Sequence, residues 1–164
     1  MDQVLRDAWK NTIEKYPARQ FSVSDFLLAM GDIEKIDENQ EAETMLWAVT
    51  NNCGCYGASA IFYPGAIKKL EEKFGNFYIL PASCHEVLIL PEFSKENVKN
   101  LEKLVQDINR TQVRPKEWLS DRVYHYDAKE KKLEFAVDYE YRMKKAEREV
   151  TLAIPAKKRE GPTL

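Results

Sequence analysis

The chain has 164 residues, of which 44% are hydrophobic and 32% are charged, and its formal net charge at pH 7 is −2. This balance indicates one globular domain and excludes a disordered chain, while the net charge gives no support for general affinity for nucleic acid or membranes. No stretch approaches the roughly 18 apolar residues that span a bilayer, the N-terminus does not resemble a secretory signal, and three cysteines are too few for a disulfide framework. We therefore expect a cytoplasmic protein with reduced thiols, no membrane association and no cofactor.

The N-terminal part of the chain predicts two helices and an acidic segment. Apolar residues recur at helical spacing over residues 4–13, and Pro17 ends that helix. Ser22 and Asp25 resemble a capping box at the start of a second helix. Residues 32–43 hold six acidic residues and one lysine, and we expect them to form a loop or a solvated helix.

The middle of the chain predicts a hairpin and a helix. Residues 45–50 predict a strand, and residues 58–63 predict its return strand. The intervening residues 51–57 predict the turn, because Asn and Gly tolerate positive φ. Pro64 favours the start of a helix, which Gly75 ends.

Two more hairpins and a helix follow. Residues 77–81 and 86–91 predict strands around the turn at residues 82–85, and residues 122–127 and 133–137 predict the last hairpin. The helix between the hairpins is expected to start near Ser94 and to bury one apolar stripe: Val98, Leu101, Leu104, Val105 and Ile108. We expect most of the following residues to lie in one core: Leu80, Val87, Leu88, Leu90, Ile67, Leu70, Leu101 and Ile108.

This order of elements predicts an α+β fold with a single antiparallel or mixed sheet, built from hairpins with helices packed on it. We expect one α+β domain over residues 1–137, with N-terminal helices at residues 1–31 and a sheet-and-helix core at residues 45–137. A charged, exposed helix and a loosely ordered tail are expected at residues 138–164.

The most apolar stretch of the chain holds Cys84, His85 and Glu86 in a row. Successive side chains of a strand point to opposite faces, so Cys84 and His85 form a nucleophile–base pair only if they lie in a turn. A distant base such as His125 is the other arrangement that would activate Cys84. The alternative is a partly buried cysteine at a strand end, with His85 hydrogen-bonded at the turn. We favour this alternative.

Cys53 and Cys55 suggest a metal site only weakly. One residue separates them, whereas structural zinc sites favour two to four and need four ligands. Cys84 and His85 would complete the set only if the two turns met at the same sheet edge. These four residues are therefore weak metal candidates, and we expect no bound metal.

Aromatic residues gather near lysines in the C-terminal third: Tyr124, Tyr126, Phe135, Tyr139 and Tyr141. Such residues would suit a stacking platform for single-stranded nucleic acid, but alternating aromatics on a strand more often pack in a core or on a sheet surface. Nucleic acid is therefore not the expected partner. We single out His85, Glu86, Tyr124 and Tyr126 as candidate residues for binding a protein.

Three blocks of the sequence resemble successive blocks of the domain-of-unknown-function family 5688, over roughly residues 8–136. They are "LWAVTNN", "YGASAIFYPGAIKKLEEKFGNFYILPASCHEVLILPE" and "VQDINRTQVRPKEWLSDRVYHYDAKEKKLEF". The resemblance implies that relatives of this chain occur mostly in gut Firmicutes and are often encoded beside mobile elements. It also implies that the chain corresponds to the C-terminal half of longer members. A weaker likeness to the family numbered 1444 supports the fold alone.

The family resemblance implies no established activity, cofactor or catalytic residue. The family block typically has the form "FYILPSSIHEVLLLP", so His85 and Glu86 fall on matching positions while Cys84 replaces an apolar residue. The turn that matches Cys53 and Cys55 usually carries polar residues and no cysteine. The resemblance therefore gives no support for cysteine chemistry.

Our leading hypothesis is a non-catalytic protein-binding or accessory module, associated with a mobile element. One alternative is an inhibitor of a host defence nuclease, acting by protein binding or by mimicry of nucleic-acid phosphates through residues 32–43. Another is an enzyme in which His85 and Glu86 converge with Asp121 or His125, because histidine is a plausible base at neutral pH. The absence of any catalytic motif favours the first hypothesis.

Overall fold

The protein is described by a computed structural model that covers residues 2–30, 46–81, 83–92 and 97–153. Six strands form one sheet in the order β1-β2-β4-β3-β5-β6, and each neighbouring pair is antiparallel. The strands are β1 (Ala18–Ser22), β2 (Trp47–Asn51), β3 (Phe77–Leu80), β4 (Val87–Pro91), β5 (Tyr124–Asp127) and β6 (Lys132–Phe135). The predicted α+β class with a single antiparallel sheet is confirmed.

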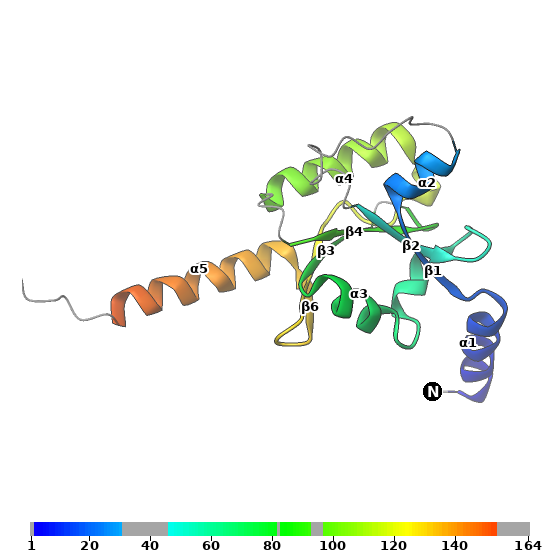
Figure 1. The fold of residues 1–164 in the computed structure, drawn as a ribbon, viewed down its shortest axis with the longest axis horizontal. Helices are drawn as coiled ribbons and strands as arrows, with labels where there is room; N and C mark the ends of the chain where they lie inside the picture. The colour runs from blue at the N-terminus through cyan, green and yellow to red at the C-terminus, as the bar shows by residue number, and fades with distance from the viewer. Residues whose placement is uncertain (1, 31–45, 82, 93–96, 154–164) are drawn as a thin grey trace, which may run out of the picture.

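Helices cover both faces of this sheet (Figure 1). The α-helices are α1 (Gln3–Lys15), α2 (Val23–Met30), α3 (Ala66–Phe74), α4 (Val98–Gln112) and α5 (Ala136–Ala153). Within the described ranges there are two short 3-10 helices, η3 (Gly57–Phe62) and η4 (Pro115–Glu117). In the view of Figure 1, α4 lies above the sheet and α3 lies below it.

The alternation of side chains along the central strands divides the interior into two cores. On β3, Phe77 and Ile79 pack with η3 and α3, whereas Tyr78 and Leu80 pack with α4 and the start of α5. We call these two sides the α3 face and the α4 face. The predicted core residues are divided between the two clusters. Most belong to the second cluster: Leu80, Leu88, Leu90, Leu101 and Ile108. The other three belong to the first: Ile67, Leu70 and Val87.

The hairpins β3–β4 and β5–β6 are confirmed. Ile79 is opposite Ile89 in the first hairpin, and His125 is opposite Glu134 in the second. Both hairpins join strands that are adjacent in sequence and carry strand-forming residues, so local pattern was sufficient to predict them.

The predicted return strand at residues 58–63 is wrong, because these residues form most of η3. Tyr56 adopts a left-handed conformation with φ of 52°, which turns the chain back over β2 instead of alongside it. The two edges of β2 are taken by β1 and β4. No edge of β2 is therefore left for residues 58–63.

Strand β1 was not predicted. It follows Pro17 directly and pairs along its whole length with β2, with Gln20 opposite Val49. Helix α2 then begins at the expected place, and the Ser22 hydroxyl accepts a hydrogen bond from the backbone N–H of Asp25 at 3.3 Å. The predicted capping at Ser22 is confirmed.

Helix α4 buries the predicted stripe with one exception. Val98, Leu101 and Val105 are buried against the sheet, but Leu104 is 45% exposed because it lies at the edge of the stripe. The Asn97 side chain accepts a hydrogen bond from the backbone N–H of Lys99 at 2.9 Å and caps the helix. The expected start near Ser94 lies outside the described residues, as does the acidic segment at residues 32–43.

Helix α5 is continuous from Ala136 and extends away from the sheet (Figure 1). Ala136 and Tyr139 are buried, whereas the side chains of residues 143–150 are exposed. A helix is therefore present where one was predicted, but its first two turns pack on the sheet and its exposed part is residues 143–150. The division at residue 137 stays a prediction, and that point falls inside the first turn of α5. No helix in the described part of the chain is long and apolar enough to cross a membrane.

Candidate functional sites

His85 ties the loop between β3 and β4 to the start of η3. Its ring Nδ1 accepts a hydrogen bond from the backbone N–H of Tyr56 at 3.1 Å, and the two rings lie 5.3 Å apart. The backbone N–H of His85 donates to the Ser83 hydroxyl at 3.0 Å. These bonds make His85 a turn residue that satisfies a backbone donor.

The rest of the Cys84-His85-Glu86 triplet shows no local catalytic pair. The backbone N–H of Cys84 donates to the Glu117 carbonyl at 2.9 Å, and its thiol is only partly exposed. Glu86 is half-buried, and its carboxylate makes no hydrogen bond or ion pair with the described residues. Among the described residues, His85 also has no hydrogen bond or ion pair with His125 or Asp121. The Asp121 carboxylate accepts a hydrogen bond from Asn109 instead.

The three cysteines are free thiols. Cys53 and Cys55 are exposed in the loop after β2, and Cys84 lies in the loop after β3. Among the residues that the structure covers, no group of three or more His, Cys, Asp or Glu side chains is arranged to hold a metal ion.

The two tyrosines chosen from the sequence have different environments. Tyr126 is buried on the α3 face, where its ring stacks on Phe77 and its hydroxyl donates to Glu71 at 2.8 Å. Tyr124 is half-buried, packs against Phe135 at 4.8 Å between ring centroids, and lines a cavity. Tyr124 is therefore the better placed of the two to contact a ligand.

The cavity beside Tyr124 is an apolar pocket on the α3 face with a volume of about 530 Å³. Apolar side chains from η3 and three strands form its floor: Ile61, Ile79, Val87 and Leu133. Cys84, Ser59 and Ser120 are among its few polar contributors. The backbone N–H of Ser120 donates to the Pro81 carbonyl at 3.0 Å, which fixes one wall. We call this cavity the apolar pocket.

Large side chains stand around the mouth of the apolar pocket. Tyr56 is 74% exposed, Phe62 is 60% exposed and Leu119 is 51% exposed. A second cavity of about 320 Å³ shares Tyr56 and Ser59 with the apolar pocket and continues toward α1. Exposed apolar surface that is gathered around a cavity is typical of a binding site.

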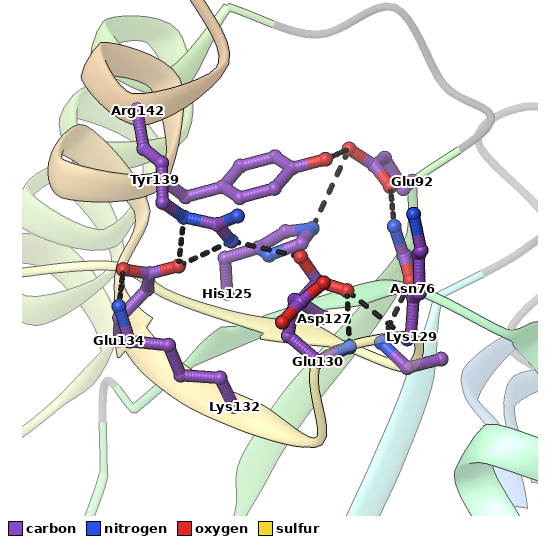
Figure 2. A network of polar contacts seen from close by, with 11 residues as sticks. Asn76, Glu92, His125, Asp127, Lys129, Glu130, Lys132, Glu134, Tyr139 and Arg142 are labelled. Carbon is purple, nitrogen blue, oxygen red and sulfur yellow. Dashed lines mark hydrogen bonds and ion pairs between the residues drawn. The ribbon is translucent and has the colours of Figure 1, made fainter. Parts of the chain in front are cut away.

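A different cluster lies on the α4 face, around the fully buried His125 (Figure 2). The His125 ring stacks on Tyr139 of α5, with 3.5 Å between centroids and 11° between planes. Its Nε2 lies 3.4 Å from Glu92 Oε1, outside hydrogen-bond geometry, so neither ring nitrogen has a hydrogen-bond partner among the described residues. Glu92 instead accepts from the Tyr139 hydroxyl at 2.6 Å and from the Asn76 amide at 2.5 Å.

Arg142 joins α5 to the β5–β6 hairpin in the same cluster (Figure 2). Its guanidinium donates to Asp127 at 2.8 Å and to Glu134 at 2.7 Å. Asp127 also accepts from the backbone N–H groups of Lys129 and Glu130, each at 3.0 Å. The hairpin turn and the second turn of α5 are thus held by one carboxylate.

Burial determines the protonation states of this cluster. Burial lowers the pKa of His125, and the neighbouring carboxylate of Glu92 only partly offsets that effect, so the ring is neutral at pH 7. Burial raises the pKa of Tyr78 to about 12, with added repulsion from Glu92 and Glu140. Burial and the hydrogen bond to Glu92 likewise raise the pKa of Tyr139.

Both sites were largely missed in the sequence. Tyr124 and Cys84 were considered, but the apolar pocket depends on η3, which the sequence predicted as a strand. The sequence suggests His125 only as a distant catalytic partner of Cys84 or of His85 and Glu86. The contacts that bury His125 come from Glu92 and Tyr139, which are far from it along the chain and carry no recognisable spacing.

These features define an α+β protein with one six-stranded antiparallel sheet, an apolar pocket on one face and a buried histidine cluster on the other. Residues 1–128 match the model of the Family of unknown function (DUF5688), and the chain belongs to this family. A search of curated proteins and a search of solved structures find no significant match. The correspondence to the C-terminal half of longer members stays a prediction.

Proposed function

We propose that the protein is a non-catalytic protein-binding module, and that the apolar pocket receives apolar side chains of its partner. The observation that carries the proposal is the ring of exposed side chains, Tyr56, Phe62 and Leu119, around an apolar cavity of about 530 Å³. This volume lies within the range of about 300–1,000 Å³ that is usual for binding pockets. Aromatic anchors beside such pockets supply much of the energy of protein interfaces.

The chemistry of the lining also supports binding over catalysis. The floor of the pocket is formed by aliphatic side chains, and Ser59, Ser120 and Cys84 have no hydrogen-bonded histidine or carboxylate partner within the described residues. A nucleophile needs such a base for activation. The enzyme hypothesis that uses His85 and Glu86 stays a prediction, and the carboxylate that lies 3.9 Å from His85 Nε2 belongs to Glu117 and not to Glu86.

The family resemblance implies relatives that often accompany mobile elements, and within this proposal the partner is a protein of the host or of such an element. Inhibition of a host defence nuclease is one form that protein binding would take. The version of that idea based on acidic mimicry depends on residues 32–43, which lie outside the described residues.

The proposal is tested with two pocket variants, Phe62→Ser and Leu119→Ser, and a matched control, Tyr141→Ser. Tyr141 is 73% exposed on α5, so the control also removes an exposed apolar side chain. All three changes are at exposed sites and should alter the free energy of unfolding by only about 0.5 kcal/mol. We expect both pocket variants to capture at least several-fold less partner from a host extract than wild type, and the control to capture as much.

A photo-crosslinking phenylalanine analogue at position 62 identifies what touches the pocket, and the same analogue at position 141 serves as its control. A protein crosslinked specifically at position 62 supports the proposal. Equal capture by all variants contradicts it. A small apolar molecule that copurifies with wild type but not with Phe62→Ser would instead assign the pocket to a small ligand.

A further inference from the structure

Helix α5 is attached to the rest of the protein through its first two turns. Ala136 is buried on the α4 face, Tyr139 stacks on His125, and Arg142 bonds to Asp127. The side chains of residues 143–150 are exposed, so they add little to this attachment. The docking of α5 therefore depends on a small cluster with His125 at its centre.

His125 is an unusual group to bury at this junction. Its ring is fully buried, and its two nitrogens lack hydrogen-bond partners among the described residues. The Glu92 carboxylate, 3.4 Å from Nε2, favours an imidazolium, but the cost of burying its charge outweighs that contact, so the position tolerates the neutral ring better. The stacking of Tyr139 at 3.5 Å leaves no room for water on that side of the ring.

We propose that His125 is a proton-sensitive latch, in which protonation of the buried ring releases the first two turns of α5 from the sheet. The latch is independent of the apolar pocket, which lies on the opposite face. It is a conformational device of the α5 junction and requires no ligand.

The charges around His125 act in both directions. Titratable and charged groups face it from each packed element: Tyr78 on β3, Glu92 after β4, Asp127 on β5, Glu134 on β6, and Tyr139 and Arg142 on α5. Glu92, Asp127 and Glu134 favour the protonated ring, but burial outweighs them, and the pKa of His125 is lowered.

The sign of the effect follows from this lowered pKa. In the released state the ring is in water, where the pKa of histidine is about 6.5. Protons therefore bind the released state more tightly, and acidification below about pH 6.5 favours release. Between pH 7.5 and 5.5 the released population should rise, by at most about tenfold.

Hydrogen exchange of the full chain tests the latch. Exchange is measured at pH 7.5 and 5.5 and corrected for the intrinsic pH dependence of amide exchange. We expect the protection of residues 136–142 to fall at pH 5.5, by at most about tenfold, while the central strands β3 and β4 keep theirs. An NMR titration of the His125 ring in wild type should give a pKa below about 6.5.

The chain contains two histidines, which provides a matched pair of variants. His125→Phe keeps a stacking ring without a titratable group and should remove the pH dependence of α5 protection. His85→Gln should retain it. If His125→Phe does not fold, the wild-type exchange and the ring titration still decide the question.

Three results would overturn the latch. The first is a change of less than twofold in residues 136–142 between the two pH values. The second is an equal loss of protection in β3 and β4, which would mean global destabilisation. The third is a His125 ring that titrates above about 6.5 with α5 more protected in acid, which would mean that Glu92 outweighs burial.

Discussion

Replacing Gly57 with alanine should strain the contact between η3 and β2. A β-carbon at position 57 would lie 2.2 Å from the Thr50 hydroxyl, 2.5 Å from the Asn51 backbone nitrogen and 2.8 Å from the His85 carbonyl oxygen. Two of these atoms belong to the backbone and cannot rotate away. The Thr50 hydroxyl donates to the same His85 carbonyl at 2.7 Å, so movement of Thr50 breaks that bond.

The expected cost has two parts. Overpacking a close contact costs about 1–3 kcal/mol, and the lost hydrogen bond adds about 0.5–1.5 kcal/mol. We therefore expect Gly57→Ala to reduce the free energy of unfolding by about 2–4 kcal/mol, a large share of the 5–15 kcal/mol that is typical of a domain. Urea unfolding at pH 7, followed by circular dichroism, measures this difference.

Gly54→Ala is the matched control. Gly54 lies in the loop that leads from β2 to η3, and its added carbon would have no atom within 4 Å other than those of its chain neighbours, but its φ is +67°. A left-handed alanine costs about 1–2 kcal/mol, so this variant should be destabilised less than Gly57→Ala. A loss below about 0.5 kcal/mol for Gly57→Ala, or a larger loss for the control, would refute the close packing of η3 on β2.

Three further predictions concern the core, the loop and acid stability. Leu101→Ala should reduce the free energy of unfolding in urea by about 2–5 kcal/mol, because Leu101 is only 3% exposed. Leu104→Ala should reduce it much less, because Leu104 is 45% exposed. Similar losses for the two variants would contradict the orientation of α4 on the sheet. His85→Ala should lower the thermal midpoint by about 2–4 °C, since the Tyr56 N–H loses its acceptor, and an unchanged midpoint would argue against a structural role. Burial alone would raise the pKa values of Asp127 and Glu134. Hydrogen bonds outweigh burial and lower both pKa values: Asp127 accepts from Arg142 and from backbone N–H groups, and Glu134 accepts from Lys132 and Arg142. These two groups therefore stabilise the fold above about pH 4, and that stability should be lost as pH falls through their folded-state pKa values. The urea midpoint of wild type should be lower at about pH 3 than at about pH 6, and Arg142→Met should reduce this difference. A difference as large as in wild type would show that groups other than Asp127 and Glu134 cause the loss of stability in acid.

Much of the fold was accessible from local patterns. The hairpins β3–β4 and β5–β6 each join neighbouring strands, and the apolar spacing of α4 and α3 identifies one buried face per helix. Ser22 was recognised as a cap because a capping side chain bonds to a backbone group three residues away. These features depend on contacts within a few residues of one another.

The errors lie where distant segments compete for the same position. Residues 58–63 carry strand-forming side chains, but β1 and β4 occupy both edges of β2 and the chain folds over its face as η3. Strand β1 was missed because its five residues acquire their strand character mainly by pairing with β2. Strand propensity is a weak guide when the partner strand decides the conformation.

The candidate sites show the same division. The sequence by itself determined the class of fold, the main helices and the presence of two histidines, because these depend on composition and short-range spacing. Only the tertiary structure decided that His85 bonds to a loop amide while His125 is buried against Tyr139 and Glu92. Burial and electrostatic environment are sums over contacts from several elements, and the residue type alone does not specify them. The packing of the chain therefore determines how the pKa of each histidine differs from its ordinary value.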